Sequence, residues 1–181
     1  DGYKLVWSGN NAKTAFIGEF DGAGHTVSGL YINSTDTYQG LFGYVNNASI
    51  ANVTVDGKIT STNNYVAGIA AYAAGKSSIT RCVNRASVSA KQYVAGVVGY
   101  ANGDTEIDRC QNNADITASS SMVGGIVSSV NGVNCKMTNC FNSGTISGTG
   151  SIGTLVATGN AKSIIENNLN IGKAVCTGTM P

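Results

Sequence analysis

The sequence contains little of what marks several common classes of protein. Its 181 residues include 1 proline, 1 tryptophan and 1 histidine, and only 12% of them are charged. Charged residues usually make up about a quarter of a protein, and a nucleic-acid-binding surface needs a basic stripe, whereas this chain has net charge +1 and no basic cluster. No apolar run approaches the roughly 18 residues of a membrane-spanning helix. We therefore expect this segment neither to bind nucleic acid nor to insert into a membrane.

Glycine and small polar residues take the place of the missing charges. The chain has 24 glycines and many Asn, Ser and Thr residues, yet 42% of its residues are hydrophobic and they recur regularly. This composition is typical of short strands joined by tight turns, because Gly and Asn tolerate positive φ. The length is sufficient for one domain with a hydrophobic core.

One phrase recurs along the chain. "YVAGIAAYAAGKSSITRC" (65–82) returns as "YVAGVVGYANGDTEIDRC" (93–110), with the apolar letters kept and the polar letters changed. Aligning on glycine and tyrosine extends the pair to five copies, spaced by 27, 28, 29 and 29 residues. The copies begin at Tyr38, Tyr65, Tyr93, Met122 and Ser151. A period of about 20 to 50 residues indicates a repeat architecture.

Each copy contains three apolar segments. The first runs from "GLFGY" (40–44) in the first copy to "GTLVA" (153–157) in the fifth. The second begins at Ile50, Ile79, Ile107, Met137 and Ile164, and the third centres on Ile59, Val88, Ile116, Ile146 and Val175. Short, β-branched segments separated by Gly, Asn and Ser indicate strands, and three strands with three turns leave no room for a helix.

We therefore predict an all-β fold, a right-handed parallel β-helix. It is a three-faced solenoid of five to six coils with about 28 residues per coil, in which equivalent strands of neighbouring coils pair about 4.8 Å apart. Stacking explains the repeated phrase, because one coil cannot bury its apolar side chains or pair its backbone alone. Residues 1–37 are expected to form an N-terminal cap and a degenerate first coil, and residues 38–181 one continuous five-coil solenoid.

The expected N-terminal cap aligns with the first copy through its apolar residues. "HTVSGLYI" (25–32) matches "ASIANVTV" (48–55), which predicts Val27 beneath Ile50 and Leu30 beneath Val53. The preceding "FIGEFDGAGH" (16–25) is expected to be a turn. Within residues 1–15, Leu5 and Trp7 are expected to cover the open edge, because an uncovered solenoid end invites aggregation.

The segments resemble the GLUG motif, which combines Gly-Leu/Ile-Val-Gly-Tyr, Ile-x-Asn-Cys and Gly-x-Val. "FDGAGHTVSGL" (20–30) is similar to the lead-in of such repeats, and the likeness covers roughly residues 16–147. Ala71 and the fifth copy (151–175) depart from the motif. The resemblance implies a piece of a large bacterial cell-surface or secreted protein, adhesin-like in many cases, and some such repeats flank metallopeptidases. It carries no catalytic residues over to this chain.

The function expected from this resemblance is that of a non-catalytic repeat module. It would act outside the cell or at the bacterial surface, as a spacer and adhesion domain beside neighbouring domains of a longer chain. Its expected partners are host glycans or host surface proteins, and no cofactor is expected. The alternative is an accessory domain of a larger secreted enzyme, such as a metallopeptidase or a glycosidase.

Three cysteines occupy one position in successive copies, namely Cys82, Cys110 and Cys140. Their spacings of 28 and 30 residues match no zinc pattern, and three thiols in one column cannot all pair as disulfides. We expect a buried column of reduced thiols that pack as small hydrophobic groups. Cys135 and Cys176 lie off this column, and the sequence leaves their redox state open.

Tyrosines form two further columns. Tyr38, Tyr65 and Tyr93 precede the first strand of each copy, and Tyr44, Tyr72 and Tyr100 follow it. An aromatic ladder on a flat face can stack on sugar rings or contact a protein, so these six residues are the candidate ligand-binding residues. The alternative is corner packing between coils with the hydroxyl groups in water.

Asparagines form a column that we expect to be structural: Asn84, Asn112 and Asn142. Stacked amides hydrogen-bond along a solenoid axis, as asparagine ladders do in cross-β stacks. Replacement of Asn84 by alanine is expected to destabilise the stack locally.

Acidic residues are dense only in "DTEID" (104–108). Glu106 and Asp108 flank an inward Ile107 and should point outward, with Lys136 of the next copy pairing with Glu106. A catalytic carboxylate pair would need acids in adjacent copies, which are lacking, and His25 has no Ser or Cys partner at a catalytic spacing. A calcium site here lacks the EF-hand pattern. No catalytic residue and no metal site are therefore expected.

Overall fold

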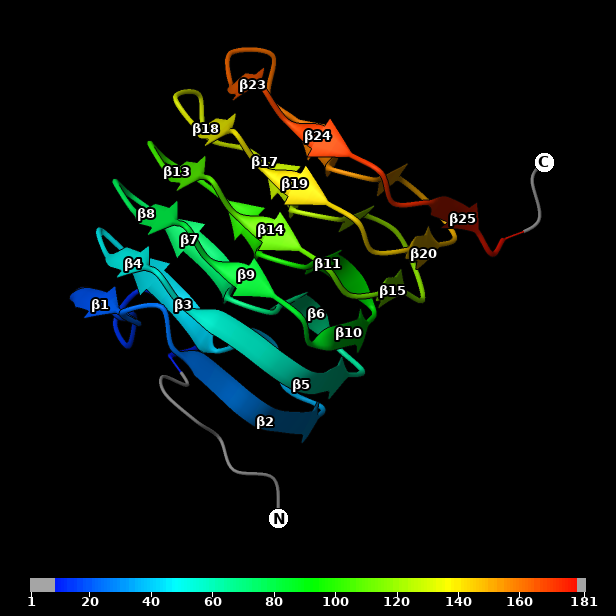
Figure 1. Cartoon of the computed structure of the whole chain (residues 1–181), viewed down its shortest axis with the longest axis horizontal. Coiled ribbons are helices and arrows are strands. Elements are labelled where there is room, and N and C mark those ends of the chain that lie inside the picture. The colour runs from blue at the N-terminus through cyan, green and yellow to red at the C-terminus, as the bar shows by residue number, and fades with distance from the viewer. Residues whose placement is uncertain (1–8, 179–181) are drawn as a thin grey trace.

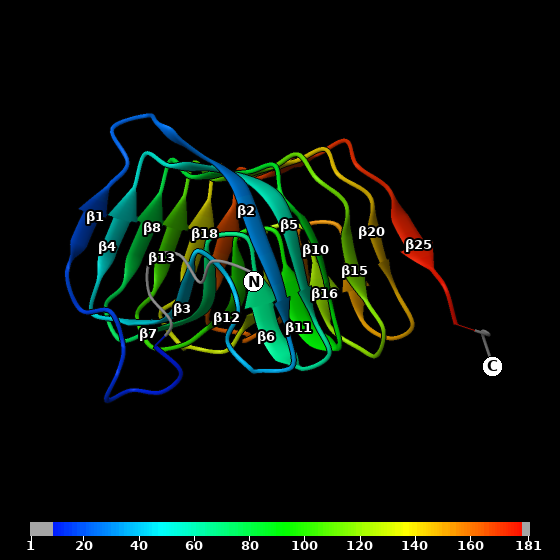
Figure 2. The same ribbon diagram turned by 90° about the horizontal axis from the view of Figure 1, so that it is seen from below.

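A computed structural model describes residues 9–178 as a solenoid made only of strands (Figure 1). The strands of this range form four sheets, and neighbouring strands in each sheet run parallel. One sheet holds six strands, one from each coil. The parallel β-solenoid predicted from the repeat is confirmed. Figure 2 shows the coils lying side by side with the same cross-section.

The first sheet, here called the isoleucine sheet, gives the clearest view of the stacking. Its six strands follow the order of the chain along the rod. They are β1 (Glu19–Asp21), β4 (Ser49–Ala51), β8 (Ser78–Thr80), β13 (Glu106–Asp108), β18 (Lys136–Thr138) and β23 (Ile164–Glu166).

The strands of the short sheet and then the tyrosine sheet precede the isoleucine sheet along the chain, from the second copy onward. The tyrosine sheet contains β3 (Phe42–Asn46), β7 (Ala70–Ala74), β12 (Val98–Ala101), β17 (Val127–Val130) and β22 (Val156–Gly159). The short sheet contains β6 (Asn64–Ala67), β11 (Gln92–Ala95), β16 (Val123–Gly124) and β21 (Ile152–Gly153).

The wide sheet has ten strands because each later coil contributes two of them. Its long strands are β2 (Thr26–Ser34) and β5 (Thr54–Ser61), which pair with each other. Over the first half of β5 lie β9 (Val83–Asn84), β14 (Gln111–Asn112), β19 (Phe141–Asn142) and β24 (Leu169–Asn170). Over its second half lie β10 (Ser87–Ala90), β15 (Ile116–Ala118), β20 (Ile146–Gly148) and β25 (Ala174–Cys176).

From the second copy onward, each coil therefore has two short strands more than the three apolar segments read from the sequence. In the second coil these are β6, before the "GIAAY" segment, and β9, after the "ITRC" segment. A residue with positive φ accompanies each: Tyr65 at 59° and Arg81 at 51°. Equivalent residues adopt this conformation in the neighbouring coils, Tyr93 at 54° and Arg109 at 52°. The bends were hidden in the sequence because non-glycine residues rarely take this conformation.

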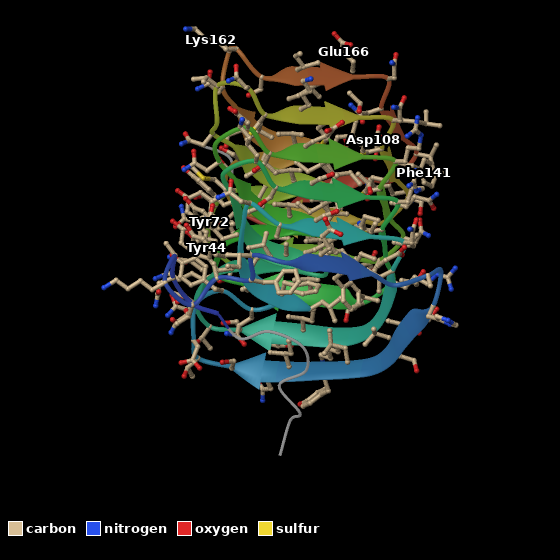
Figure 3. All side chains as sticks on the ribbon, turned by 90° about the vertical axis from the view of Figure 1, so that its left-hand side faces the viewer. Tyr44, Tyr72, Asp108, Phe141, Lys162 and Glu166 are labelled. Carbon is tan, nitrogen blue, oxygen red and sulfur yellow. The ribbon has the colours of Figure 1, made fainter. Side chains whose placement is uncertain are left out.

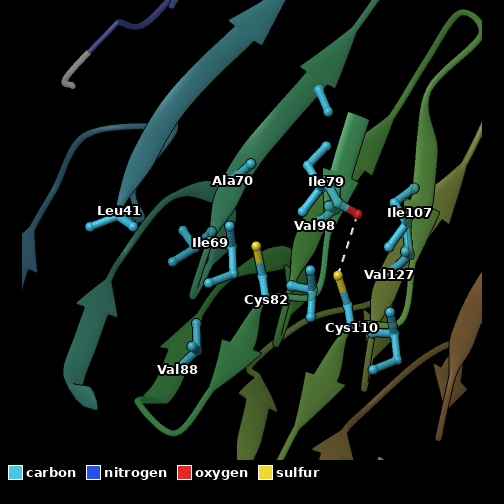
Figure 4. Packing of buried hydrophobic residues seen from close by; sticks show 14 of the residues in the cluster. Leu41, Ile69, Ala70, Ile79, Cys82, Val88, Val98, Ile107, Cys110 and Val127 are labelled. Carbon is cyan, nitrogen blue, oxygen red and sulfur yellow. Dashed lines mark hydrogen bonds between the residues drawn. The ribbon is translucent and has the colours of Figure 1, made fainter. Parts of the chain in front are cut away.

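Isoleucines at one position of the isoleucine sheet form the centre of the core. Ile50 pairs with Ile79, Ile79 with Ile107, and Ile107 with Met137, and all four side chains are buried. Figure 4 shows Ile79 and Ile107 from this column beside Cys82 and Cys110, which lie just after β8 and β13. Because the coils stack in register, equivalent side chains lie above one another, and the cross-section of the core is repeated from coil to coil.

Three predictions for the fifth copy are wrong by one residue. Ser129 lies beneath Thr158 and not Ala157, and Met137 lies beneath Ile165 and not Ile164. Both segments lie one residue later than predicted, because the alignment set Gly153 opposite Gly125, whereas the structure pairs it with Gly124. The third segment deviates the other way, since Ile146 lies beneath Ala174 and not Val175.

The alignment proposed for the cap is also wrong. Phe20, in the segment predicted to be a turn, forms part of β1 and lies beneath Ile50. Val27 lies beneath Val55, and Leu30 beneath Gly57 across an irregularity in the pairing. An aromatic residue fills the isoleucine position here, which a search for repeated β-branched letters overlooks. The expected covering residues Leu5 and Trp7 lie outside the described residues.

The last described coil leaves its apolar side chains uncovered. Ile165 is 41% exposed, whereas the equivalent Ile107 is fully buried. Leu169 and Ile171 are 59% and 68% exposed. Among residues 9–178 no further coil packs on this end, which explains the contrast.

Candidate functional site

Six tyrosines form two stacked columns on one face of the rod. One column, Tyr38, Tyr65 and Tyr93, comes from the start of three successive copies. The other column, Tyr44, Tyr72 and Tyr100, lies in β3, β7 and β12. Ring centroids in the first column are 5.1 Å apart between Tyr38 and Tyr65 and 4.7 Å apart between Tyr65 and Tyr93. In the second column Tyr44 and Tyr72 are 4.5 Å apart, and Tyr72 and Tyr100 are 5.0 Å apart. We call these six residues the tyrosine face.

The two columns also contact each other edge to face. Tyr65 meets Tyr72 at 5.8 Å and Tyr100 at 5.7 Å, with planes 64° and 81° apart. The two central rings, Tyr65 and Tyr72, are thus held by partners above, below and beside them, a geometry that aromatic quadrupoles favour. Figure 3 shows Tyr44 and Tyr72 one above the other at the edge of the molecule. The rings are half-buried, so the face is rigid and still reachable from solvent.

Close packing perturbs the phenol groups. Burial, with the neighbouring Tyr72 as the next cause, raises the pKa of Tyr44 to about 12. Burial and the neighbouring Tyr93 raise the pKa of Tyr65 to about 12 as well. The tyrosine face is therefore neutral at physiological pH, and it offers ring faces and hydroxyl groups rather than charge.

The columns end at the fourth coil, where a pocket begins. Ser129 pairs with Tyr100 in register, and Thr158 pairs with Ser129, so the ring is missing at two successive levels of this column. A cavity of about 380 Å³ occupies this place, lined by Tyr93, Tyr100, Met122, Ser129, Asn131 and Thr158, among others. The lining has no charged side chain.

The polar side chains of this pocket differ in their protein partners. Ser129 is only 7% exposed, and its hydroxyl makes no hydrogen bond to another described residue. The Asn160 amide donates to the carbonyl oxygen of Asn131 at 3.3 Å and accepts from the backbone N–H of Lys162 at 3.0 Å. In the third coil, the amide of Asn102 donates to the hydroxyl oxygen of Tyr72 in the coil below at 3.4 Å. Asn131 occupies the equivalent position in the fourth coil, on the open side of Tyr100.

The cysteine column lies in the core. Cys82, Cys110 and Cys140 are buried and free, and the Cys110 thiol donates to the carbonyl oxygen of Ile79 at 3.4 Å (Figure 4). Burial raises the pKa of Cys110 well above its usual value. Cys135 is free and buried as well, with its thiol 3.2 Å from the carbonyl oxygen of Gly103. Cys176 is free and exposed.

The asparagine column is a continuous hydrogen-bonded ladder. Each side-chain nitrogen donates to the amide oxygen of the next asparagine at 2.8 Å, along Asn84, Asn112, Asn142 and Asn170. The first three are fully buried. Asn170, which our alignment missed, extends the ladder into the fifth copy.

Glycines make room for this ladder. A Cβ on Gly96 would lie 2.4 Å from Oδ1 of Asn112 and 2.4 Å from the carbonyl oxygen of Gly125. Gly68 stands in the same relation to Asn84. These glycines belong to the repeated phrase, so the close approach of the asparagine explains why the phrase contains them.

The acidic group at 104–108 is part of a structural network. Asp108 is 8% exposed and accepts hydrogen bonds from Thr138 and Asn139, both at 2.7 Å, and from Arg109 at 2.6 Å. Burial alone would raise the pKa of Asp108, but the hydrogen bonds from Asn139 and Thr138 outweigh it and lower the pKa. The carboxylate is held as a charged acceptor and is not poised to exchange a proton near neutral pH.

Glu106 differs from Asp108 in having no such partners. It is exposed and lies opposite Lys136 in register, as the sequence suggested. The predicted ion pair with Lys136 is not among the salt bridges of the described residues, where Asp108 and Arg109 form one. Glu106 and Asp108 therefore occupy unlike environments. Both flank the buried Ile107, as expected, but Asp108 is covered by its hydrogen-bond partners.

Residues 9–178 contain neither a metal-binding cluster nor a membrane-spanning helix. No group of three or more His, Cys, Asp or Glu side chains lies close enough together there to hold a metal ion. Nor does this range contain a helix with the length and apolar character needed to span a membrane.

Comparison of the chain with models of protein families, with curated proteins and with solved structures found no match.

Proposed function

We propose that this chain is a non-catalytic repeat module of a bacterial surface or secreted protein, which holds neighbouring domains apart and attaches to host glycans or host surface proteins. The tyrosine face is the observation that carries the attachment role. It is aromatic, neutral, rigid and half-exposed, and it repeats at the spacing of the coils.

The spacer role follows from the stacking. Neighbouring coils are tied together by parallel strand pairing, and the second to fifth copies also by the asparagine ladder through the core. A rod whose units contact only their neighbours gains stiffness from continuous main-chain pairing and needs no large globular core. The outward location and the bacterial source are supported by the resemblance to the GLUG motif.

Stacked tyrosines suit attachment because they lose little conformational freedom on binding. The rings are already fixed by their neighbours, so ordering them costs less than ordering free side chains. Ring faces pack on the apolar faces of sugars and on apolar protein surfaces alike. The tyrosine face therefore supports either class of partner.

A glycan array probed with the purified chain tests the attachment role. We expect binding to a subset of glycans that is lost in Tyr72→Ala, at the centre of the tyrosine face. The control is Tyr31→Phe, on the exposed side of β2 away from the columns. Absence of binding to glycans and to host-cell surface protein would refute the attachment role. Release of reducing sugar from a polysaccharide panel would refute the non-catalytic assignment.

A further inference from the structure

The pocket at the end of the tyrosine columns has the geometry of an unfilled ring position. Within β7 and β12 each tyrosine ring lies on the ring below it, with centroids 4.5 to 5.0 Å apart. At the next level Ser129 replaces the tyrosine, and the upper side of Tyr100 borders a cavity of about 380 Å³. That volume lies within the roughly 300–1,000 Å³ typical of small-molecule sites.

The polar groups around this position lie at both of its ends. Ser129 stands where the missing ring would be attached, it lines the cavity, and its hydroxyl has no hydrogen-bond partner among the described residues. Asn131 stands at the opposite end, in the position from which Asn102 reaches the hydroxyl of Tyr72 in the lower coil. An occupant therefore needs a six-membered ring with hydroxyl groups at both ends.

We propose that this pocket binds one pyranose residue of a glycan, stacked on Tyr100 and hydrogen-bonded to Ser129 and to Asn131. A tyrosine side chain entering from a protein partner would bring a single hydroxyl and leave one end of the position unpaired. A pyranose carries hydroxyl groups on several sides and can pair both ends, which favours the sugar. The absence of charged lining residues excludes recognition that depends on an ionic group.

This inference rests on the proposed attachment function, because it assigns glycan binding to one pocket rather than to the whole tyrosine face. The two ideas make different predictions for the two ends of the same column. Tyr100 borders the pocket, whereas Tyr44 lies two coils lower and does not line it. Tyr44→Ala and Tyr100→Ala remove the same side chain at two different levels of the column.

The experiment is titration calorimetry, with saturation-transfer NMR, against cellobiose, lactose, maltose, mannobiose and chitobiose. We expect at least one disaccharide to bind, at least tenfold more weakly in Tyr100→Ala and with a smaller loss in Tyr44→Ala. Binding should stay within twofold of the native affinity in Tyr31→Ala, on the exposed side of β2 outside the tyrosine face. A fourth variant, Ser129→Tyr, fills the position with the ring that lower coils carry. It should fold, as judged by circular dichroism, and should abolish binding.

The possible results separate the two proposals. Equal losses in Tyr44→Ala and Tyr100→Ala would overturn the pocket and leave attachment through the tyrosine face. Native binding in the folded Ser129→Tyr variant would overturn the pocket outright. Binding of N-acetyltyrosinamide but of no disaccharide would overturn the sugar assignment, and binding of no probe at all would count against both proposals.

Discussion

Replacement of Asn112 by alanine should be among the most damaging single changes to this chain. The Asn112 amide oxygen accepts from Asn84 at 2.8 Å, and its nitrogen donates to Asn142 at 2.8 Å and to the carbonyl oxygen of Ala114 at 2.9 Å. The side chain is fully buried. Truncation therefore breaks the ladder in the middle of the rod.

The size of the effect follows from the groups left behind. Two buried groups lose a partner, the Asn84 nitrogen and the Asn142 oxygen, and so does the half-buried Ala114 carbonyl. The Asn84 nitrogen keeps its bond to the carbonyl oxygen of Ala86. The loss at one buried group costs about 1–3 kcal/mol, so we expect a loss of about 2–6 kcal/mol in the free energy of unfolding. Such a loss is comparable with the whole stability of many domains.

Urea unfolding followed by far-UV circular dichroism measures this loss. Two control variants show how it depends on burial of the asparagine. Asn113→Ala removes the same side chain one position away, where it is exposed, and should change stability by less than about 0.5 kcal/mol. Asn170→Ala removes the half-buried end of the ladder, where water can replace its bonds, and should cost about 1 kcal/mol. If Asn112→Ala and Asn113→Ala unfolded at the same urea concentration, the buried ladder would not contribute to stability as argued here.

Three further predictions concern the core, the tyrosines and the thiols. Ile107→Ala should cost about 2–5 kcal/mol in the same assay and Ile165→Ala less than half as much, because the second side chain is 41% exposed; equal losses would contradict the open end. The folded pKa of Tyr44 and Tyr65 is raised from 10.0 to about 12, so the stability that follows from their neutral form is complete below pH 10 and is lost as pH rises toward 12. The melting temperature should therefore fall across this window, and it should fall by less in a variant that carries both Tyr44→Phe and Tyr65→Phe. With a thiol reagent, Cys176 should react rapidly and the other cysteines only after urea is added; a second fast thiol would contradict their burial.

The repeat made the architecture predictable. Glycine and tyrosine at a constant spacing fixed the register of Ile50, Ile79 and Ile107, and the structure pairs them as expected. The sequence failed where that signal fades. The fourth copy has two consecutive glycines, and the alignment set Gly153 of the fifth copy opposite the wrong one, so the segments that follow were misplaced by one residue. The cap presents Phe20 where the repeat has isoleucine.

The site was only partly visible in the sequence. Equal spacing predicted which tyrosines share a column, but not that the two columns interlock edge to face. The pocket was missed because it arises from an absence: Ser129 and Thr158 matter through the rings they lack. Comparing the residue that each copy places at the Tyr100 position would have located it. Asp108 was misjudged because its partners Thr138 and Asn139 come from the next coil, in a pairing that outward polar letters do not reveal.

The central claim is that successive coils share one cross-section, so that equal residues lie directly above one another. A crystal structure of the chain tests it most directly. The account predicts parallel pairing of Ile79 with Ile107 and amide contacts near 2.8 Å from Asn84 through Asn142. Antiparallel pairing of the strands that carry these residues, or asparagine side chains directed into solvent, would contradict it.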